Sequence, residues 1–139
     1  MQKYYETAVI TIEAALTAVQ AAIKEGRKQG VMVSVAVVDP SLTLIAFGKA
    51  DGATPHSVET SRRKANTAAS TRRSTGWMGE SLAITLPMSA GNLLTNVPGG
   101  FPVLFDGKLV GGLGIAGGTV EQDAAVAQAT IASLGADTE

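Results

Sequence analysis

The chain contains a single histidine, His56, and this side chain is its best candidate for binding a metal ion. His56 follows Asp51-Gly52 and Pro55, residues that are typical of a turn leading into a helix. An imidazole at such a helix start could face a pocket and bind a metal. The alternative is an ordinary polar residue in a first helical turn, because no partner residue accompanies it.

Five basic residues follow between positions 62 and 73. Arginine presents a planar fork to carboxylates, so Arg62, together with Lys64, could bind the carboxylate groups of a ligand. Arg62 and Arg73 are eleven residues apart, about three helical turns, and would share one face of a continuous helix. The cluster could equally form a solvated face or contact another copy of the chain. Without interleaved aromatic residues it is not expected to bind nucleic acid.

A third candidate lies at Gly117-Gly118-Thr119, where a helix is expected to begin. Backbone N–H groups and the helix dipole at such a start can bind an anion. The segment is not a Walker loop, since no lysine follows it. Tight packing of a strand against the helix, with Thr119 as the cap, is the alternative. Asp123, with Glu121, could act as a base or metal ligand, or could simply favour the helix dipole.

The composition restricts the class of protein. The chain has 139 residues, of which 45% are apolar and 17% charged, with a net charge of −1 and no cysteine. One domain over residues 1–139 is therefore expected, without disulfides or thiolate metal sites. A net charge this small does not attract the chain to nucleic acid or to a membrane surface. Neither a secretory signal nor a membrane span is recognisable. From the lack of a recognisable signal or span we expect a cytoplasmic protein. We also expect a homo-oligomer, because few charges and short side chains favour a buried interface between copies of the chain.

Periodicity and turn residues predict the elements that position these side chains. Apolar residues spaced by four and three indicate amphipathic helices whose apolar stripes face inward. The first stripe includes Ile12, Leu16 and Val19, widened by Ala15 and Ala22, and the last includes Val120, Ala124, Ala127 and Ile131. Runs of β-branched residues between turn residues indicate strands. Asp106-Gly107 is the strongest hairpin signal, and Thr119 with Gln122 forms a capping box. The expected elements are a helix over residues 5–26, strands over 31–38 and 42–49, a helix over 55–71, strands over 101–105 and 108–115, and a helix over 120–134. Hairpins rather than crossovers predict an α+β fold with an antiparallel sheet covered by helices.

Residues 74–98 form the segment that the pattern describes least. We expect a short helix, a loop and a short strand near residues 93–97. A loop of this length inside a compact domain is usually functional. The expected ligand pocket therefore lies among the start of the second helix, this loop and the Gly117-Gly118-Thr119 turn. The glycines of the last strand predict that another segment approaches that strand closely.

Three stretches resemble the GlcG/HbpS family, and their order and spacing match along nearly the whole chain. They are Val35-Ala36-Val37-Val38-Asp39; Asp51-Gly52-Ala53 with Ser57, Lys64-Ala65 and Thr67-Ala68-Ala69; and Gly99-Gly100-Phe101-Pro102-Val103 with Asp106-Gly107, Val110-Gly111 and Gly117-Gly118-Thr119-Val120-Glu121-Gln122-Asp123. Pro40-Ser41 stand where the family usually has glycines, and no Glu-x-x-Glu iron motif is found.

The resemblance implies a profilin-like α/β/α sandwich, with a five-stranded antiparallel sheet flanked by helices. It also implies assembly into dimers or higher even oligomers, and haem or a related tetrapyrrole as ligand, with a role in its degradation. If haem is the ligand, His56 is the candidate for binding its iron, and Arg62 and Lys64 are candidates for binding its propionates. The relation to the PduO C-terminal domain makes a corrinoid-linked role an option. Two other functions stay open: an enzyme or accessory protein acting on a small carboxylate in a catabolic pathway, and a purely structural oligomer. No catalytic constellation decides among them.

Overall fold

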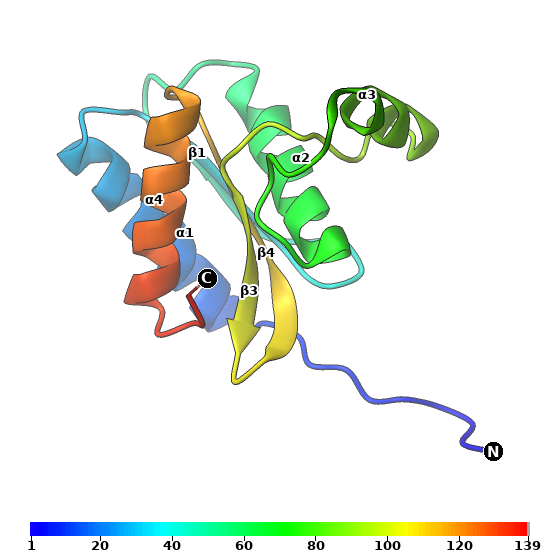
Figure 1. The fold of residues 1–139 in the computed structure, drawn as a ribbon. Coiled ribbons are helices and arrows are strands. Elements are labelled where there is room, and N and C mark those ends of the chain that lie inside the picture. The colour runs from blue at the N-terminus through cyan, green and yellow to red at the C-terminus, as the bar shows by residue number, and fades with distance from the viewer. Residues whose placement is uncertain (139) are drawn as a thin grey trace.

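The computed structural model describes residues 1–138 of the chain. Figure 1 shows how helices and hairpins alternate within this range. The helices are α1 (Ile12–Lys28), α2 (Ser57–Thr71), α3 (Glu80–Ser89) and α4 (Val120–Ser133), and the strands are β1 (Ser34–Val38), β2 (Leu44–Lys49), β3 (Gly100–Phe105) and β4 (Lys108–Ala116). None of these helices is both long and apolar enough to cross a lipid bilayer.

The strands form one antiparallel sheet in the order β2-β1-β4-β3. This confirms the α+β class and the antiparallel pairing. The expectation of five strands is wrong for residues 1–138, where the sheet has four. The segment near residues 93–97 adds no strand because side chains of α2 bind its backbone: Asn66 Nδ2 donates to Leu93 O, and Thr67 Oγ1 accepts from Thr95 N.

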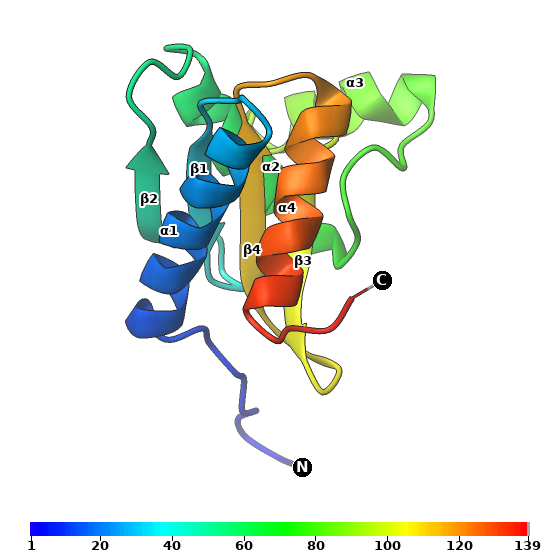
Figure 2. The ribbon, with the colours of Figure 1, turned by 90° about the vertical axis from the view of Figure 1, so that its left-hand side faces the viewer.

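Helices cover both faces of the sheet (Figure 2). Helices α1 and α4 contact each other and pack on one face, whereas α2 packs on β1, β3 and β4 from the other face. The main apolar core lies under α1 and α4, and a smaller cluster of Ala36, Val38, Ala65 and Ala69 lies under α2. Helix α3 buries none of its residues and stands beside this body.

Glycines bring α2 unusually close to the sheet. A Cβ at Gly112 would collide with Ala65 O, and one at Gly114 would collide with Ser61 O. The glycines of β4 predicted that another segment approaches this strand closely, and that segment is the backbone of α2. This contact holds the face of α2 that carries Lys64 against the end of β4.

Helix α1 begins seven residues later than position 5, at Ile12. Thr11 caps the helix by accepting a hydrogen bond from Ala14 N. Ile10 N donates to Val110 O, which ties the preceding residues to β4 instead of a helical turn. The expectation of helix over residues 5–11 is therefore wrong, because capping and strand contacts compete with the apolar spacing.

The expected inward stripes of α1 and α4 are only partly correct. Val19 and Ile131 are buried, but Ile12, Leu16 and Val120 remain 47%, 50% and 40% exposed. The expected stripe members Ala15, Ala22 and Ala127 are buried, and the closest approach to the sheet also uses Ala18, Val126 and Thr130. Small residues allow closer packing against the valines of β1, so larger apolar residues at the helix margins are left outside.

The short-range signals of the second hairpin and the last helix are confirmed. Strands β3 and β4 meet at Asp106-Gly107, whose φ angles of 53° and 78° suit a primed hairpin turn. Thr119 and Gln122 form the reciprocal capping box of α4. Asp137 lies beside this hairpin, because its carboxylate accepts hydrogen bonds from both turn amides, Asp106 N and Gly107 N.

Candidate functional site

One face of α2 carries three polar side chains toward the end of the sheet. His56, Thr60 and Lys64 are four residues apart and therefore lie on the same side of the helix. They line a half-open cavity of about 330 Å³ together with residues from the segment before β3 and from the β4–α4 connection, which are Thr54, Val97, Ala116, Gly117, Gly118, Val120 and Asp123. The cavity thus joins the helix start and the glycine turn that the sequence singled out.

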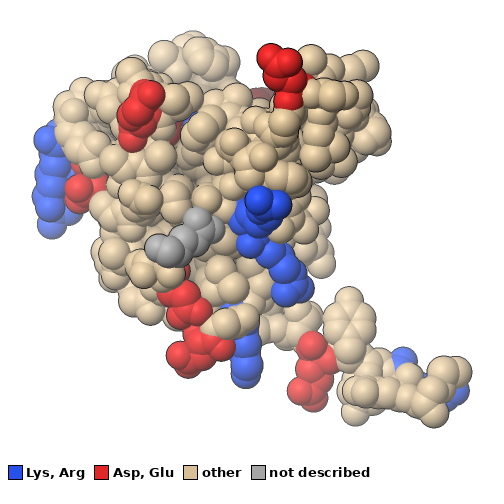
Figure 3. Space-filling model, viewed as in Figure 1, with Lys and Arg blue, Asp and Glu red and all other residues tan. Residues whose placement is uncertain are grey.

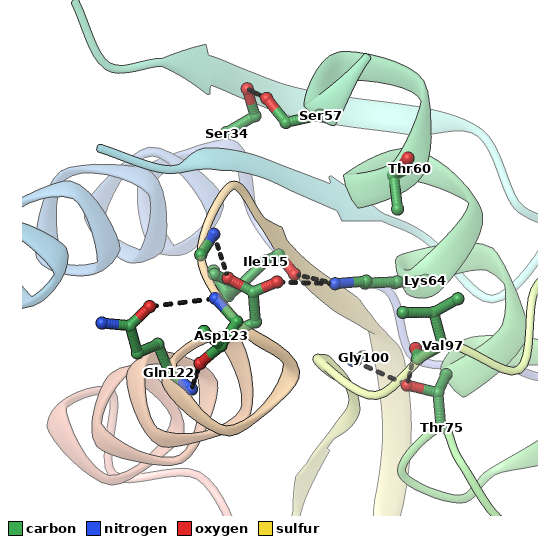
Figure 4. A network of polar contacts seen from close by, with 12 residues as sticks. Ser34, Ser57, Thr60, Lys64, Thr75, Val97, Gly100, Ile115, Gln122 and Asp123 are labelled. Atoms are coloured by element: carbon green, nitrogen blue, oxygen red, sulfur yellow. Dashed lines mark hydrogen bonds and ion pairs between the residues drawn. The ribbon is translucent and has the colours of Figure 1, made fainter. Parts of the chain in front are cut away.

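An ion pair between Lys64 and Asp123 lies at the base of this cavity (Figure 4). Lys64 Nζ donates to Asp123 Oδ2 at 2.9 Å and to Ile115 O at 2.8 Å. The two side chains are only 1% and 4% exposed. A close approach of Gly99 completes the enclosure, because a Cβ there would lie 2.9 Å from Lys64 Nζ.

Burial and charge act in opposite directions on Lys64. Loss of water around the ammonium group lowers its pKa, while the carboxylate of Asp123 raises it through charge and hydrogen bonding. The loss of solvation is the larger effect, so the pKa of Lys64 lies below the ordinary value of 10.5. The pair carries no net charge while both groups are ionised, and therefore adds no excess positive potential to the cavity.

The donors of the glycine turn already have partners inside the protein. Gly118 N donates to Asp123 Oδ1 at 2.9 Å, and Thr119 N donates to Gln122 Oε1 at 2.9 Å. A Cβ at Gly117 would meet Met32 O at 2.5 Å, which shows how tightly the turn packs on the chain before β1. The turn is thus built as a capped, close-packed connection, and its first amides are not directed at an external anion.

His56 lies at the rim of the cavity and is exposed. It is the residue before the first turn of α2, and its carbonyl accepts from Thr60 N and Thr60 Oγ1. Within residues 1–138 no hydrogen bond from its imidazole ring to protein is found. The ring is therefore available to an external ligand.

The basic cluster does not converge on this cavity. Arg62 faces away from it, pairs with Glu59 at 3.7 Å and lines a smaller cavity of about 130 Å³ beside Asn92. Arg73 lies over the ring of Trp77, 4.1 Å from its centroid. Figure 3 shows basic side chains in separate groups, with acidic side chains between them. Of the basic residues between positions 62 and 73, only Lys64 lines the same cavity as His56, Gly117, Gly118 and Asp123.

Several lining residues were missed by sequence reasoning. Thr60 could have been found from its spacing of four residues from both His56 and Lys64. Val97 is the only cavity residue from the long 74–98 segment, so most of that segment does not form the expected apolar wall. Within residues 1–138, no three His, Asp or Glu side chains are close enough to hold a metal ion by themselves.

The fold and this cavity define a small α+β domain with a ligand-sized hollow at one end of its sheet. The model of the family described as "Haem degrading protein HbpS-like" matches residues 10–132. The chain therefore belongs to the HbpS-like family.

The chain is also similar to individual proteins of known name or structure. Protein GlcG of Escherichia coli K12 is 36% identical over 113 residues, covering 77% of this chain and 81% of that protein. The crystal structure of a Streptomyces reticuli HbpS double mutant is 34% identical, with a TM-score of 0.85 over 97% of this chain and 93% of that one. A PduOC–haem complex is 28% identical, with a TM-score of 0.87 over 95% of this chain and 99% of that one.

Proposed function

We propose that this protein binds haem or a related tetrapyrrole at the cavity between the start of α2 and the β4–α4 turn. The family description and the haem complex of a structural relative support the ligand class. The observation that best supports this site is the exposed His56 imidazole at the rim of a cavity whose apolar lining comes from Val97, Ala116 and Val120. A role in haem degradation is proposed on the family description alone.

The cavity is large enough for one edge of a porphyrin ring but not for the whole ring. Val97 and Val120 are each 40% exposed at the cavity and offer apolar contact to a flat ring. A volume of about 330 Å³ is near the lower end for ligand pockets, roughly 300–1,000 Å³. The ring would therefore enter by one edge, with His56 as an iron ligand. Bound haem would supply a redox-active iron.

The neutral base of the cavity sets the orientation of such a ligand. Because Asp123 already pairs with Lys64, the cavity base offers no uncompensated cation to the propionates. We therefore expect the propionates to point outward, toward solvent, and the apolar edge to point inward. This replaces the expectation that Lys64 and Arg62 bind the propionates.

We also propose that the protein forms a homo-oligomer, a dimer or a higher even number. Large apolar side chains stay exposed on α3, where Ile84 is 64% and Met88 69% exposed. An apolar helix without a buried face is typical of an element that a partner covers. A second copy could also cover the part of a porphyrin that projects from the cavity.

An absorbance titration with ferric haem tests the ligand. Wild-type protein is expected to give a saturable Soret spectrum, and His56→Ala to lose or strongly shift it. The matched control places histidine elsewhere: Gln20→His, on the exposed face of α1, should not restore the spectrum in the His56→Ala background. An unchanged spectrum in His56→Ala would show that His56 is not the ligand, and no saturable spectrum in wild type would contradict haem binding.

The alternative of a small-carboxylate ligand is favoured by cavity volume, since a half-open cavity of about 330 Å³ can accommodate a whole small molecule. The paired charges of Lys64 and Asp123 count against it, because a carboxylate would find no uncompensated cation there. Calorimetric titration with glycolate separates the two: saturable heat without any haem spectrum would favour the carboxylate.

A further inference from the structure

Lys64 is a buried amine to which the proposed mode of haem binding assigns no contact with the ligand. Its Nζ has three N–H groups, of which two are bonded to Asp123 Oδ2 and Ile115 O. Within residues 1–138 the third has no hydrogen-bond partner, and Lys64 lines the cavity. A small molecule inside the cavity can therefore approach an amine that bulk solvent scarcely reaches.

We propose that Lys64 forms a reversible protonated imine with a small, neutral aldehyde that enters this cavity. Two features of the geometry support the assignment. The amine lies at the base of a hollow of about 330 Å³, and a carboxylate that can move protons lies 2.9 Å from it. The proposal goes beyond haem binding and does not depend on it.

The environment favours amine chemistry over a purely structural ion pair. Burial lowers the pKa of Lys64, so a larger fraction of the amine is uncharged at neutral pH than for a surface lysine. The product also suits the site. A protonated imine keeps the positive charge, so the buried carboxylate of Asp123 does not lose its partner when the bond forms.

The step balances with Asp123 as the only protein base. Asp123 accepts a proton from the Lys64 ammonium group, and the amine lone pair attacks the aldehyde carbon. Asp123 returns this proton to the former carbonyl oxygen, giving a carbinolamine. It then takes a second proton from nitrogen and delivers it to the departing hydroxyl group. The aldehyde and the ammonium group thus give a protonated imine and one water, with no oxidant or reductant.

The charge of the site selects the class of aldehyde. The Lys64–Asp123 pair is neutral overall, and the nearest turn amides are engaged by Asp123 and Gln122. An aldehyde that carries a carboxylate or phosphate would therefore lack a partner for its charge. A short-chain uncharged aldehyde fits better, and Thr60, which lines the cavity, can accept a hydrogen bond from the carbinolamine hydroxyl group.

Reductive trapping on the haem-free wild-type protein tests the proposal. The protein is incubated with acetaldehyde and cyanoborohydride at neutral pH, and ethylation of each lysine is followed over time by peptide mass mapping. Lys49 and Lys108 are exposed and serve as internal references. We expect Lys64 to be ethylated faster than either, by more than the two references differ from each other, because its lowered pKa leaves more of the amine uncharged. A rate at Lys64 equal to or below the references overturns the proposal.

A second variant separates access through the cavity from unfolding. Thr60→Phe narrows the cavity in front of Lys64 without touching the ion pair, and folding is checked by circular dichroism. It is expected to lower the Lys64 rate at least roughly fivefold and to leave the Lys49 and Lys108 rates unchanged. An unchanged Lys64 rate in folded Thr60→Phe would show that acetaldehyde does not arrive through this cavity. No haem is used, so failure of haem binding does not affect the result.

Discussion

Lys64 and Asp123 connect helices that lie on opposite faces of the sheet. Their Nζ and Oδ2 atoms are 2.9 Å apart, and the same ammonium group binds Ile115 O at the end of β4. The pair therefore joins α2 to α4 around the end of the sheet, between two helices that pack on its opposite faces. The cavity exists at this point because the two layers meet there through polar atoms.

Removing one member of this pair should destabilise the protein strongly. Lys64→Met leaves the Asp123 carboxylate buried without its cation, and we expect the free energy of unfolding to fall by about 3–5 kcal/mol. The double variant Lys64→Met/Asp123→Leu removes both charges and should recover much of this loss. Urea unfolding measures both. A loss below about 1 kcal/mol in Lys64→Met would mean that the pair is solvated in solution.

The lowered pKa of Lys64 gives stability a defined pH dependence. Between the lowered value and 10.5 the unfolded chain binds a proton at this position that the folded chain does not. Stability therefore rises with pH across that window and levels off above it. Urea unfolding of the wild type and of Lys64→Met, measured from neutral pH upward, tests this. The difference between their free energies of unfolding should increase with pH. A decrease over the same range would contradict this sign.

The contact between α2 and β4 should tolerate no side chain at Gly114. Its Cβ would collide with Ser61 O, so α2 must move away from the sheet in Gly114→Ala. We expect a loss of about 1–3 kcal/mol or more in thermal or urea unfolding. Gly79→Ala is the matched control, because a Cβ there meets nothing within 4 Å and its φ is −68°. Equal stability of the two variants would refute the close packing.

The hairpin at Asp106-Gly107 should depend on the carboxylate of Asp137. Asp137→Ala removes both hydrogen bonds to the turn amides, and we expect a loss of about 1 kcal/mol because the group is exposed. Amide hydrogen exchange at Asp106 and Gly107 should accelerate in the same variant. Glu121→Gln, an exposed change at the opposite end of β4, serves as the control; an equal effect there would exclude a specific role for Asp137.

Self-association should depend on the apolar surface of α3. Analytical ultracentrifugation of wild-type protein at micromolar concentration is expected to show a dimer or a higher even oligomer. Ile84→Ser/Met88→Ser should shift the distribution toward monomer, since both side chains are exposed in the single chain. A monomeric wild type would contradict the proposed assembly, and an unchanged oligomer in the double variant would place the interface elsewhere.

Local signals in the sequence predicted most of the fold. The Asp106-Gly107 turn, the capping box at Thr119 and the glycines of β4 act over a few residues, so their chemistry is visible without knowledge of the tertiary structure. Helix α1 was predicted in part: Ala15 and Ala22 of its expected stripe are buried, but periodicity alone does not show that Ile12 and Leu16 stay half-exposed. Packing distance decided that outcome.

The candidate site was predictable only in its parts. His56, Lys64 and the glycine turn could be singled out by residue type, and the cavity brings them together. The pairing of Lys64 with Asp123 could not be foreseen, because it joins residues 59 positions apart through the arrangement of three elements. Its consequence, a neutral cavity base, changed the expected role of Lys64 from a propionate partner to a buried amine.

The proposed haem site is tested most directly by paramagnetic broadening of amide resonances in a two-dimensional NMR spectrum. Strand β4 separates its two ends by about 30 Å, with Gly107 before one end and Gly117 after the other. Ferric haem at the cavity should broaden the amides of Thr60, Gly117 and Gly118 first, while those of Gly107 and Gly135 stay sharp. Broadening centred on the Gly107 end, or uniform broadening without saturation, would contradict haem binding at this cavity.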